Sequence, residues 1–461
     1  MTPVDTLCGS RVAVFGLGAS GLSAARALLA GGAEVVLWDD SEKARERAAE
    51  AGFPLADLAQ ADWREFDLLV LSPGTPLTHP KPHWTVALAA AAGVPVVGDI
   101  ELFSRQREAR APRAHFVAVT GTNGKSTTTA LIAHVLSQAG RDAALGGNIG
   151  VPVLDLPPPA STRAHVIECS SYQIDLAPSL APSVGLLLNV TPDHLDRHGD
   201  LKHYAAVKER LVARSEIALV GVDDEPSRDI CARLKARSGP QRVVAVSGAD
   251  SPLADVFVRD RRILARAGSE PPIDLDAARA LRGAHNGQNA AFAYAAARAL
   301  GVASEPTARA FETFPGLAHR MEEVGRKGRV LFINDSKATN ADAAEKALLS
   351  FHDIHWIVGG KPKEGGIEPL RPLFSRIAKA YLIGEATELF AVTLADKLPF
   401  QRCGALGPAT EAAARDALRS HADEPVVLLS PACASFDQFL NFEARGDAFR
   451  AAVAELLKGK G

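Results

Sequence analysis

The chain has 461 residues, too many for one hydrophobic core, which predicts two to four domains. With 47% hydrophobic and 23% charged residues it has a globular composition, and its net charge of −3 argues against nucleic acid or membrane lipid as the main partner. The five cysteines form no C-x-x-C pair, which argues against a disulfide framework or a thiolate metal site. We find neither a secretory leader nor a membrane-spanning run, and therefore expect a cytoplasmic protein.

The first motif is a glycine-rich turn between two predicted strands. An apolar run over 11–15 leads into Gly-Leu-Gly-Ala-Ser-Gly at 16–21, and a second strand over 34–38 ends at Asp39. Such a turn, with an acidic residue about twenty positions on, is typical of a nucleotide site. A tight turn that needs glycine only for packing would give the same pattern, so this motif alone is a weak signal.

Alternation of strands and helices continues beyond this turn. The sequence predicts strands over 68–71 and 95–97 with a helix over 83–92 between them. A first domain is therefore expected to end near residue 104. The charged stretch 105–113, which closes with Ala-Pro-Arg, indicates a linker.

The central motif is Thr120-Gly-Thr-Asn-Gly-Lys-Ser126, which follows an apolar run and begins a predicted helix. Its glycines let backbone N–H groups converge on an anion, Lys125 adds positive charge, and the Ser126 hydroxyl suits Mg²⁺. The usual spacing places glycine at 119, where this chain has Val119, so the loop is a variant. An ordinary turn with a surface lysine is the alternative, but the strand and the hydroxyl-rich helix start favour phosphate binding.

Residues downstream of this loop include candidates for a metal site. Glu168 follows an apolar strand, where a nucleotide-bound Mg²⁺ finds a second ligand, although it could instead cap a helix. His194 and His198 stand four apart, but no glutamate follows His194 as a zinc-protease helix needs, so we favour a loop histidine near Mg²⁺. The spacing of Lys208, in a predicted helix over 201–214, indicates a solvated surface lysine.

Two further segments border this region. Gly146 to Gly150 is predicted to be a loop where backbone approaches a ligand. Asn286 and Asn289 precede an alanine-rich helix, and spacing favours capping over ligand binding. A second linker is expected around 314–316.

The last part of the chain places polar segments after three predicted strands. These segments cover 334–340, 359–366 and 430–437 and are rich in lysine, glycine and hydroxyl groups. The carboxyl ends of parallel strands lie along one sheet edge, so the segments should cluster there. Their lysines and hydroxyls suit a ligand that carries carboxylates, although ordinary turns would explain any one of them.

Taken in order, these pieces resemble the Mur ligase family over nearly the whole chain. Six segments carry the resemblance: 120–126, 168–173, 193–197, 319–320, 334–340 and 430–439. It implies an α/β protein of three domains, each with a mostly parallel sheet: a Rossmann-like UDP-sugar domain over 1–104, a P-loop ATPase-like domain over 105–315, and a Rossmann-like amino-acid domain over 316–461.

The resemblance implies an ATP-dependent ligase with two Mg²⁺ ions. The implied metal ligands are Ser126, Glu168, His194 and a carbamoylated Lys208, and the implied catalytic residues are Lys125, His194 and Lys208. The residues implied to bind ATP are Gly121, Thr122, Asn123, Gly124, Lys125, Ser126, Thr127, Asn289, Arg320 and Asp335.

The same resemblance implies two further substrates, UDP-N-acetylmuramoyl-L-alanine and D-glutamate. The residues implied for the nucleotide-sugar are Ser20, Asp39, Gly74, Asn148, Gln173 and His194. Those implied for D-glutamate are Lys337, Thr339, Lys363, Ser435 and Phe442. Lys361 is an alternative to Lys363, and Asp39 is followed by a second aspartate, Asp40. We expect a monomer that binds neither nucleic acid nor membrane.

Other functions explain less of the sequence. A folylpolyglutamate synthase would share the phosphate loop but would not need a nucleotide-sugar domain. A non-catalytic nucleotide-binding scaffold would tolerate loss of Lys125 or Glu168, yet both are present. A dehydrogenase would explain only the turn at 16–21 and would leave the phosphate loop without a role.

Overall fold

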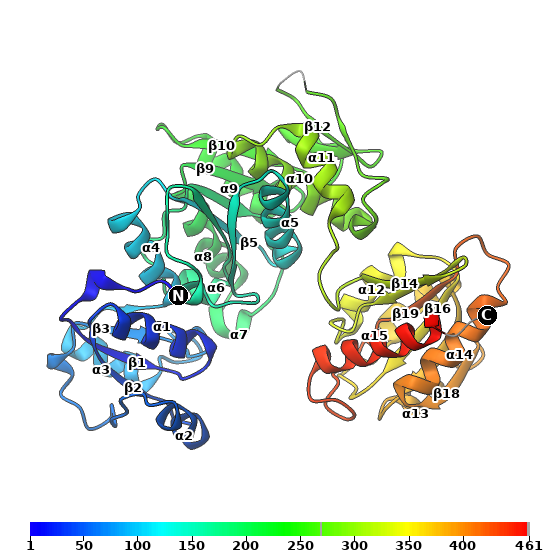
Figure 1. Ribbon diagram of the computed structural model, residues 1–461, viewed down its shortest axis with the longest axis horizontal. Helices are drawn as coiled ribbons and strands as arrows, with labels where there is room; N and C mark the ends of the chain where they lie inside the picture. The colour runs from blue at the N-terminus through cyan, green and yellow to red at the C-terminus, as the bar shows by residue number, and fades with distance from the viewer. Residues whose placement is uncertain (268–269, 459–461) are drawn as a thin grey trace. The chain divides into compact units, whose positions relative to one another are not determined.

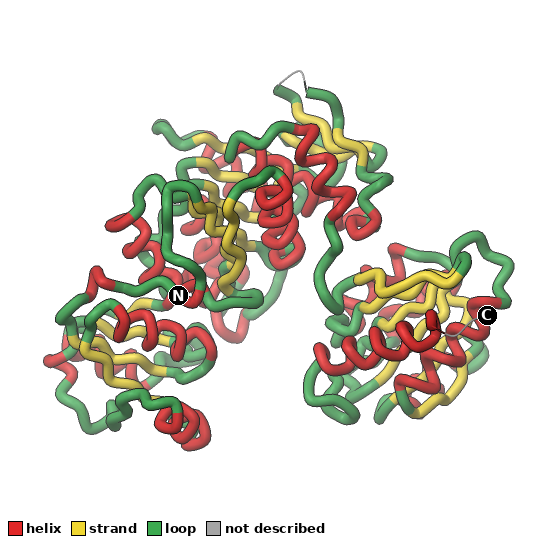
Figure 2. The backbone as a smooth tube through the Cα atoms, viewed as in Figure 1, coloured by secondary structure: helices red, strands yellow, loops and turns green. Residues whose placement is uncertain are grey.

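The computed structural model describes residues 1–267 and 270–458 and contains three β-sheets with helices packed on them (Figure 1). Helices and strands alternate along most of the chain, as the tube in Figure 2 shows. The predicted α/β class is therefore confirmed. Two compact units are present, one of Met1–Ala277 with His285–Glu312 and one of Ala278–Ala284 with Thr313–Gly461. The first two expected domains share a unit, so their boundary stays a prediction.

The first sheet is wholly parallel, in the order β2-β1-β3-β4. Its strands are β1 (Arg11–Phe15), β2 (Glu34–Trp38), β3 (Leu68–Leu71) and β4 (Val96–Val97). Its helices are α1 (Ala19–Ala30), α2 (Glu42–Glu50), α3 (Trp84–Ala92) and α4 (Asp99–Arg110). At Gly21 an added Cβ would lie 1.8 Å from the carbonyl oxygen of Gly16, so close packing of α1 on the turn requires glycine there.

The expected linker over 105–113 is wrong, because α4 continues to Arg110. Ile100, Leu102 and Phe103 of this helix are buried in the core that joins the first two sheets. A charged residue of the stretch is also part of this core: Arg107 is buried and donates to the carbonyl oxygen of Ala114 at 3.0 Å. Buried charge with a satisfied hydrogen bond is compatible with a core, so the stretch is a helix packed in the unit.

The central sheet has nine strands in the order β13-β12-β11-β10-β9-β8-β5-β7-β6, in which β12 runs antiparallel to its two neighbours, β11 and β13. The strands are β5 (His115–Thr120), β6 (Asp142–Gly147), β7 (Arg163–Glu168), β8 (Val184–Leu187), β9 (Ile217–Gly221), β10 (Arg242–Val246), β11 (Val256–Arg259), β12 (Arg262–Ala265) and β13 (Ile273–Asp274). The helices are α5 (Lys125–Gln138), α6 (Ser171–Asp175), α7 (Leu195–His198), α8 (Leu201–Ala213), α9 (Glu225–Lys235), α10 (Ala284–Ala299) and α11 (Ser304–Thr313). Gly146 and Gly147 end β6, so the expected loop begins two residues later than predicted.

The third sheet has the order β14-β15-β19-β16-β17-β18, with only β14 antiparallel. Its strands are β14 (Glu322–Lys327), β15 (Val330–Asn334), β16 (Ile354–Gly359), β17 (Ile377–Ile383), β18 (Phe400–Gly404) and β19 (Val426–Leu429). Its helices are α12 (Ala341–Ser350), α13 (Thr387–Leu394), α14 (Leu406–Leu418) and α15 (Phe442–Lys458).

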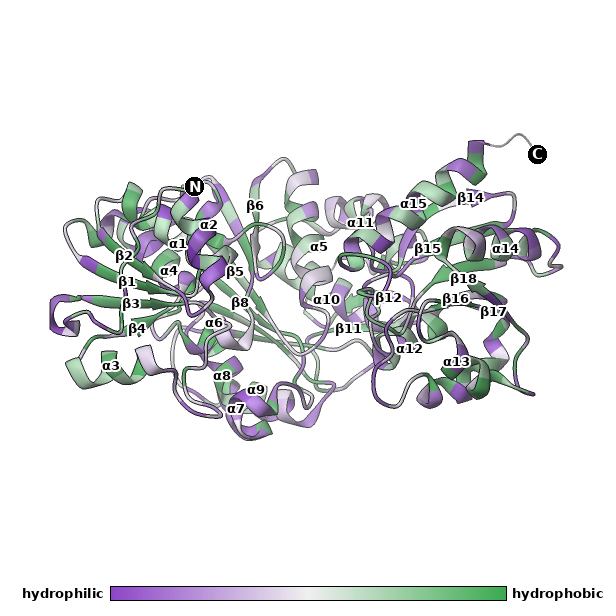
Figure 3. Ribbon diagram, turned by 90° about the horizontal axis from the view of Figure 1, so that it is seen from below, coloured by the Kyte–Doolittle hydropathy of each residue, from purple (hydrophilic) through white to green (hydrophobic). Residues whose placement is uncertain are grey.

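Parallel strands covered on both faces need continuous apolar runs, and these strands have them. Every residue of β3, β16 and β19 is buried, and Figure 3 colours the strands predominantly as hydrophobic. Within residues 1–267 and 270–458, no helix combines the length and apolar character needed to cross a bilayer.

Candidate active site

The phosphate loop joins the end of β5 to the start of α5, as predicted. Gly124 is the N-cap residue of α5 and has a left-handed φ of 83°. A Cβ there would lie 2.3 Å from Oδ1 of Asn289, so this position needs glycine for both its conformation and its space. The N-terminus of α5, a 14-residue helix, therefore faces a loop made of backbone, which suits an anion.

Two lysines meet at the carbonyl groups of this loop. Nζ of Lys125 donates to the carbonyl oxygens of Gly121 at 2.9 Å and Thr122 at 2.8 Å. Nζ of Lys208, from α8, donates to the same Gly121 oxygen at 2.9 Å and to Oγ1 of Thr120 at 3.3 Å. The two amines thus converge on one carbonyl oxygen beneath the loop.

Lys208 is only 1% exposed, so the expectation of a solvated lysine was wrong. It shares the buried face of α8 with Tyr204, Val207 and Leu211, and its ammonium lies 4.6 Å from the centre of the Tyr204 ring. Burial, reinforced by the charge of Lys125, lowers the pKa of Lys208 well below its usual value. A lysine in this position loses its proton more readily than a solvated lysine does.

Glu168 lies beside the loop, because β7 pairs with β5 in a register that sets Glu168 against Val119. Its Oε1 accepts a hydrogen bond from Nδ2 of Asn148 at 2.8 Å. Its Oε2 is buried and has no hydrogen-bond partner among the described residues. A buried carboxylate oxygen left without a partner is costly, so this atom is a strong candidate to ligate a cation.

The segment after β8 brings His194 to the same region. Oγ1 of Thr122 in the phosphate loop donates to the carbonyl oxygen of Thr191 at 3.1 Å. His194 then precedes α7 in a left-handed conformation, φ 53°, and its ring lies 5.1 Å from that of Tyr172. The side chain of His194 is 47% exposed. The histidine is thus held near the loop but remains accessible.

Asn286 and Asn289 are not caps, because α10 already begins at Ala284. Both are buried, and Nδ2 of Asn289 donates to Oδ1 of Asn286 at 3.0 Å. Oδ1 of Asn289 accepts from Thr128 of α5 at 3.2 Å. The pair therefore joins α10 to the helix that carries the phosphate loop.

A buried aspartate that the sequence analysis missed connects the first sheet to the central one. The Asp99 carboxylate accepts from Nε2 of Gln173 at 3.2 and 3.4 Å and also bonds the Ser20 side chain. Burial raises the pKa of Asp99. Its place two residues after β4 and at the first position of α4 was the available signal.

Asp39 and Gly74 lie on the same side of the first sheet as the glycine-rich turn. Oδ2 of Asp39 accepts from the backbone N–H of Leu17 at 2.7 Å, so this carboxylate orients the turn. The carbonyl oxygen of Gly74 accepts from Arg197 of α7 at 3.0 Å. Asp39 therefore contacts the glycine-rich turn, whereas Gly74 contacts α7.

In the second unit the three polar segments meet, as predicted from the strand ends. β19 lies between β15 and β16, and the backbone of Lys361 pairs with that of Ala434. The buried Arg445 donates to the carbonyl oxygens of Ser336 at 2.8 Å and Cys433 at 3.1 Å. Its guanidinium fixes the first and third segments against each other.

The titratable groups of this cluster differ in burial. Asp335 is buried and accepts from Ser430 at 2.8 Å, and burial raises its pKa to about 7. Lys337 is exposed and places its ammonium 5.2 Å from the centre of the Phe442 ring. Ser435 is buried, whereas Lys361 and Lys363 are both exposed. The cluster offers exposed cations beside buried polar groups.

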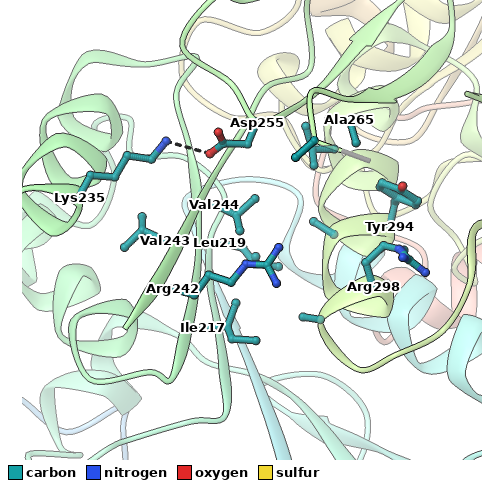
Figure 4. A pocket seen from close by; sticks show the side chains of 14 residues that line it. Ile217, Leu219, Lys235, Arg242, Val243, Val244, Asp255, Ala265, Tyr294 and Arg298 are labelled. Atoms are coloured by element: carbon teal, nitrogen blue, oxygen red, sulfur yellow. Dashed lines mark hydrogen bonds and ion pairs between the residues drawn. The ribbon is translucent and has the colours of Figure 1, made fainter. Parts of the chain in front are cut away.

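A separate cavity of about 360 Å³ lies between β9–β11 and α10 (Figure 4). Two of the cations that line it are in ion pairs, Lys235 with Asp255 at 2.8 Å and Arg298 with Glu270 at 2.6 Å, and Arg242 lines it as well. No residue of 120–126 is among the described residues that line it. The cavity is therefore distinct from the phosphate-loop site.

Comparison with known sequences covers most of the chain. Residues 119–297 match the Mur ligase middle domain, residues 10–98 the Mur ligase MurD-like N-terminal domain, and residues 319–433 the Mur ligase glutamate ligase domain. UDP-N-acetylmuramoylalanine–D-glutamate ligase of Rhizobium etli is 57% identical over 99% of this chain and 97% of its own. The enzyme of that name from Nitrobacter hamburgensis is 58% identical over 99% and 98%.

The chain belongs to the Mur ligase family.

Solved structures agree with this Mur ligase fold. The UDP-N-acetylmuramate–alanine ligase of Thermotoga maritima is 16% identical, with a TM-score of 0.60 over 97% of this chain and 100% of its own. MurF of Acinetobacter baumannii is 20% identical, with a TM-score of 0.56 over 78% and 80%. At such low identities the likeness concerns the fold alone.

The residues implied by the Mur ligase resemblance divide between the two units. Those expected for the nucleotide-sugar and for the ATP phosphates lie in the first unit, and those expected for D-glutamate lie in the second. Arg320 and Asp335, expected to contact ATP, also belong to the second unit. The assignment of these residues to ligands remains a prediction.

Proposed function

We propose that this Mur ligase uses ATP to join D-glutamate to UDP-N-acetylmuramoyl-L-alanine in peptidoglycan precursor synthesis. The observation that carries the proposal is 57% identity, over 99% of the chain, to a relative named for that reaction. The charged phosphate loop and the lysine-rich cluster of the second unit suit the two halves of the chemistry. We further propose that it acts as a monomer in the cytoplasm.

The reaction has two steps, formation of an acyl phosphate and formation of the amide. The terminal carboxylate of the alanyl nucleotide-sugar attacks the γ-phosphorus of ATP, and ADP leaves, which gives an acyl phosphate. The amine of D-glutamate then attacks the acyl carbon, and phosphate leaves as the amide forms and a proton is lost. Lys125 stabilises the transferring phosphoryl group, and its two hydrogen bonds to loop carbonyls hold it in place beforehand.

The residues present fit two Mg²⁺ ions. The unpartnered Oε2 of Glu168 and the Ser126 hydroxyl at the start of α5 would hold one ion. His194 and a carbamoylated Lys208 would hold the other. Burial favours the neutral amine of Lys208, the form that adds CO₂, and the carbamate would restore an anion beside the loop. Bound Mg²⁺ supplies charge neutralisation between the carboxylate and the triphosphate.

The family resemblance supports the assignment of the remaining ligand contacts. Asn289, Arg320 and Asp335 would contact ATP, together with the loop residues Gly121, Thr122, Asn123, Gly124 and Thr127. The residues that would contact the nucleotide-sugar are Ser20, Asp39, Gly74, Asn148, Gln173 and His194. Lys337, Thr339, Lys363, Ser435 and Phe442 would hold D-glutamate, with cations for its two carboxylates and an apolar wall.

Phosphate release from ATP, measured with the alanyl nucleotide-sugar and one amino acid at a time, tests the proposal. D-Glutamate should support the fastest release. L-Glutamate and D-aspartate should support slower release. L-Glutamate keeps both charges but moves its amine out of line for attack on the acyl carbon, and the shorter D-aspartate leaves a cation or hydroxyl of the site without its partner. Faster release with L-alanine, L-lysine or diaminopimelate would exclude the proposed acceptor while leaving the family assignment intact.

A further inference from the structure

Three side chains outside the proposed active site converge at the ends of short helices. Asp175 is the last residue of α6, His198 is the last residue of α7, and His203 lies in the first turn of α8. One ligand atom of each lies within 4.8 Å of those of the other two. None of the three has a role in the proposed reaction.

The two imidazoles each have a nitrogen with nothing to bind. Nδ1 of His198 and Nε2 of His203 are buried and have no hydrogen-bond partner within the described part of the chain. His198 as a whole is only 2% exposed. Buried polar nitrogens normally have a hydrogen-bond partner or a metal ion. Two buried nitrogens without one in the same cluster therefore indicate a ligand site.

The surroundings of His198 prepare it as a ligand. Its Nε2 lies 2.9 Å from Oγ of Ser171. The tautomer with hydrogen on Nε2 donates to that oxygen and leaves the lone pair of Nδ1 unshared, which is how metal-ligating histidines are usually oriented. Burial also lowers the pKa of His198 to about 4, so the ring is neutral at physiological pH.

Asp175 supplies the anion of the cluster. Arg210 donates to its Oδ1 at 2.8 Å, which orients the carboxylate. A small pocket beside the cluster is lined by Asp175 and His198 together with residues of the 73–78 loop. His79, at the end of that loop, is exposed, and its ring centre lies 6.4 Å from that of His203. The cluster therefore has an opening and a fourth donor nearby.

We propose that Asp175, His198 and His203 form a site for a divalent transition-metal ion, with Zn²⁺ as the best match. Two imidazoles and one carboxylate are a ligand set that zinc accepts, whereas Mg²⁺ prefers oxygen ligands. A tetrahedral zinc ion holds its ligand atoms roughly 3.4 Å apart, so side-chain shifts of about 1 Å suffice to close the site.

This site differs from the zinc site that the spacing of His194 and His198 in the sequence would suggest. In the structure, His198 lies with Asp175 and His203 instead. An ion at this position ties the ends of α6, α7 and α8 together. Its expected role is structural: it stabilises the segment that begins with His194 and takes no part in the chemistry.

The test is a titration of the full, tag-free chain with ZnCl₂ in excess Mg²⁺, followed by calorimetry and by the melting temperature. Co²⁺ serves as a second probe because its visible absorption reports the ligand geometry. The wild type should bind one zinc ion and melt at a higher temperature with it. His203→Gln and Asp175→Asn should bind at least about tenfold more weakly and lose that shift.

Two controls separate this site from others. His421→Gln, which removes an exposed histidine of the second unit, should bind like the wild type. His194→Ala should also keep its zinc, because His194 belongs to the proposed Mg²⁺ site. Equal zinc binding by the wild type and His203→Gln would overturn the proposal, and so would loss of zinc in His194→Ala alone.

Discussion

The phosphate loop and the polar cluster of the second unit both present lysines, but they hold them differently. Lys208 is 1% exposed, and it and Lys125 each donate to backbone carbonyls of the loop. Lys337 and Lys363 are exposed, and the Lys337 ammonium lies 5.2 Å from the centre of the Phe442 ring. Backbone carbonyl groups hold the first pair in place before any ligand arrives, whereas the second pair is open to solvent. Loss of a preorganised group should reduce the rate of turnover, and loss of a solvent-exposed cation should weaken binding.

The largest expected effect is that of Lys125→Ala. Removal of a charge aimed at the transferring phosphoryl group costs on the order of 3 kcal/mol or more, so kcat should fall about a hundredfold or further. Phosphate-release kinetics measure the loss, and circular dichroism checks the fold. Activity within about threefold of the wild type, in a folded variant, would refute the phosphate-loop interpretation.

The next largest effect is expected for Lys208→Ala. We expect activity to fall by roughly one to two orders of magnitude, because the variant loses the group proposed to become an anionic Mg²⁺ ligand. Added bicarbonate should raise wild-type activity at limiting Mg²⁺ and leave the variant unchanged. Lys202→Ala, at an exposed position of the same helix, is the matched control. Full activity of Lys208→Ala at limiting Mg²⁺ would exclude the carbamate.

A smaller effect of another kind is expected for Lys337→Ala. The KM for D-glutamate should rise about tenfold, with a lesser change in kcat, because an exposed cation contributes to binding before it contributes to the transition state. Ser435→Ala and Phe442→Ala should shift the same parameter, and Lys397→Ala, an exposed lysine, should not. A fall in kcat with unchanged KM would mean that this cluster is as preorganised as the loop.

The smallest effect concerns stability and depends on pH. Burial raises the pKa of Asp335 from its ordinary 3.8 to about 7, so between these values the folded state binds the extra proton. The free energy of unfolding contributed by this group is therefore greatest below about pH 4 and falls as pH rises to about 7.

Asp335→Asn tests this, because it cannot ionise. Its melting temperature should exceed that of the wild type at pH 8, by an amount equivalent to on the order of 2 kcal/mol, and the gap should narrow at pH 5. Asp423→Asn, at an exposed position, should show no such dependence. An equal difference in melting temperature at both pH values would contradict the interpretation that the Asp335 carboxyl is buried and protonated.

The sequence predicted the sheets and the phosphate loop well, because apolar runs and glycine turns are local signals. It failed where charged residues are buried. Lys208 falls at helical spacing with Tyr204, Val207 and Leu211, a stripe that could have revealed its burial. Arg107 is also buried, within a stretch whose charge suggested a linker, and Asp99 is buried six residues before that stretch.

Partners far apart in the chain explain the other failure. Asn289 contacts Thr128, 161 residues away, and no spacing rule connects the two. The same holds for Asp175, His198 and His203, which only folding brings together. The ligand assignments came from resemblance and still await the experiments above.

The second unit is not continuous in the sequence, since it includes Ala278–Ala284 as well as the chain from Thr313 onward. Arg282 of the early segment pairs with Glu424 at 2.6 Å. A chimera that exchanges acceptor specificity by joining a relative's sequence at residue 313 would separate this pair. Recombination would need three crossovers, at 277/278, 284/285 and 312/313, which limits how freely evolution or a protein engineer can exchange this part between relatives.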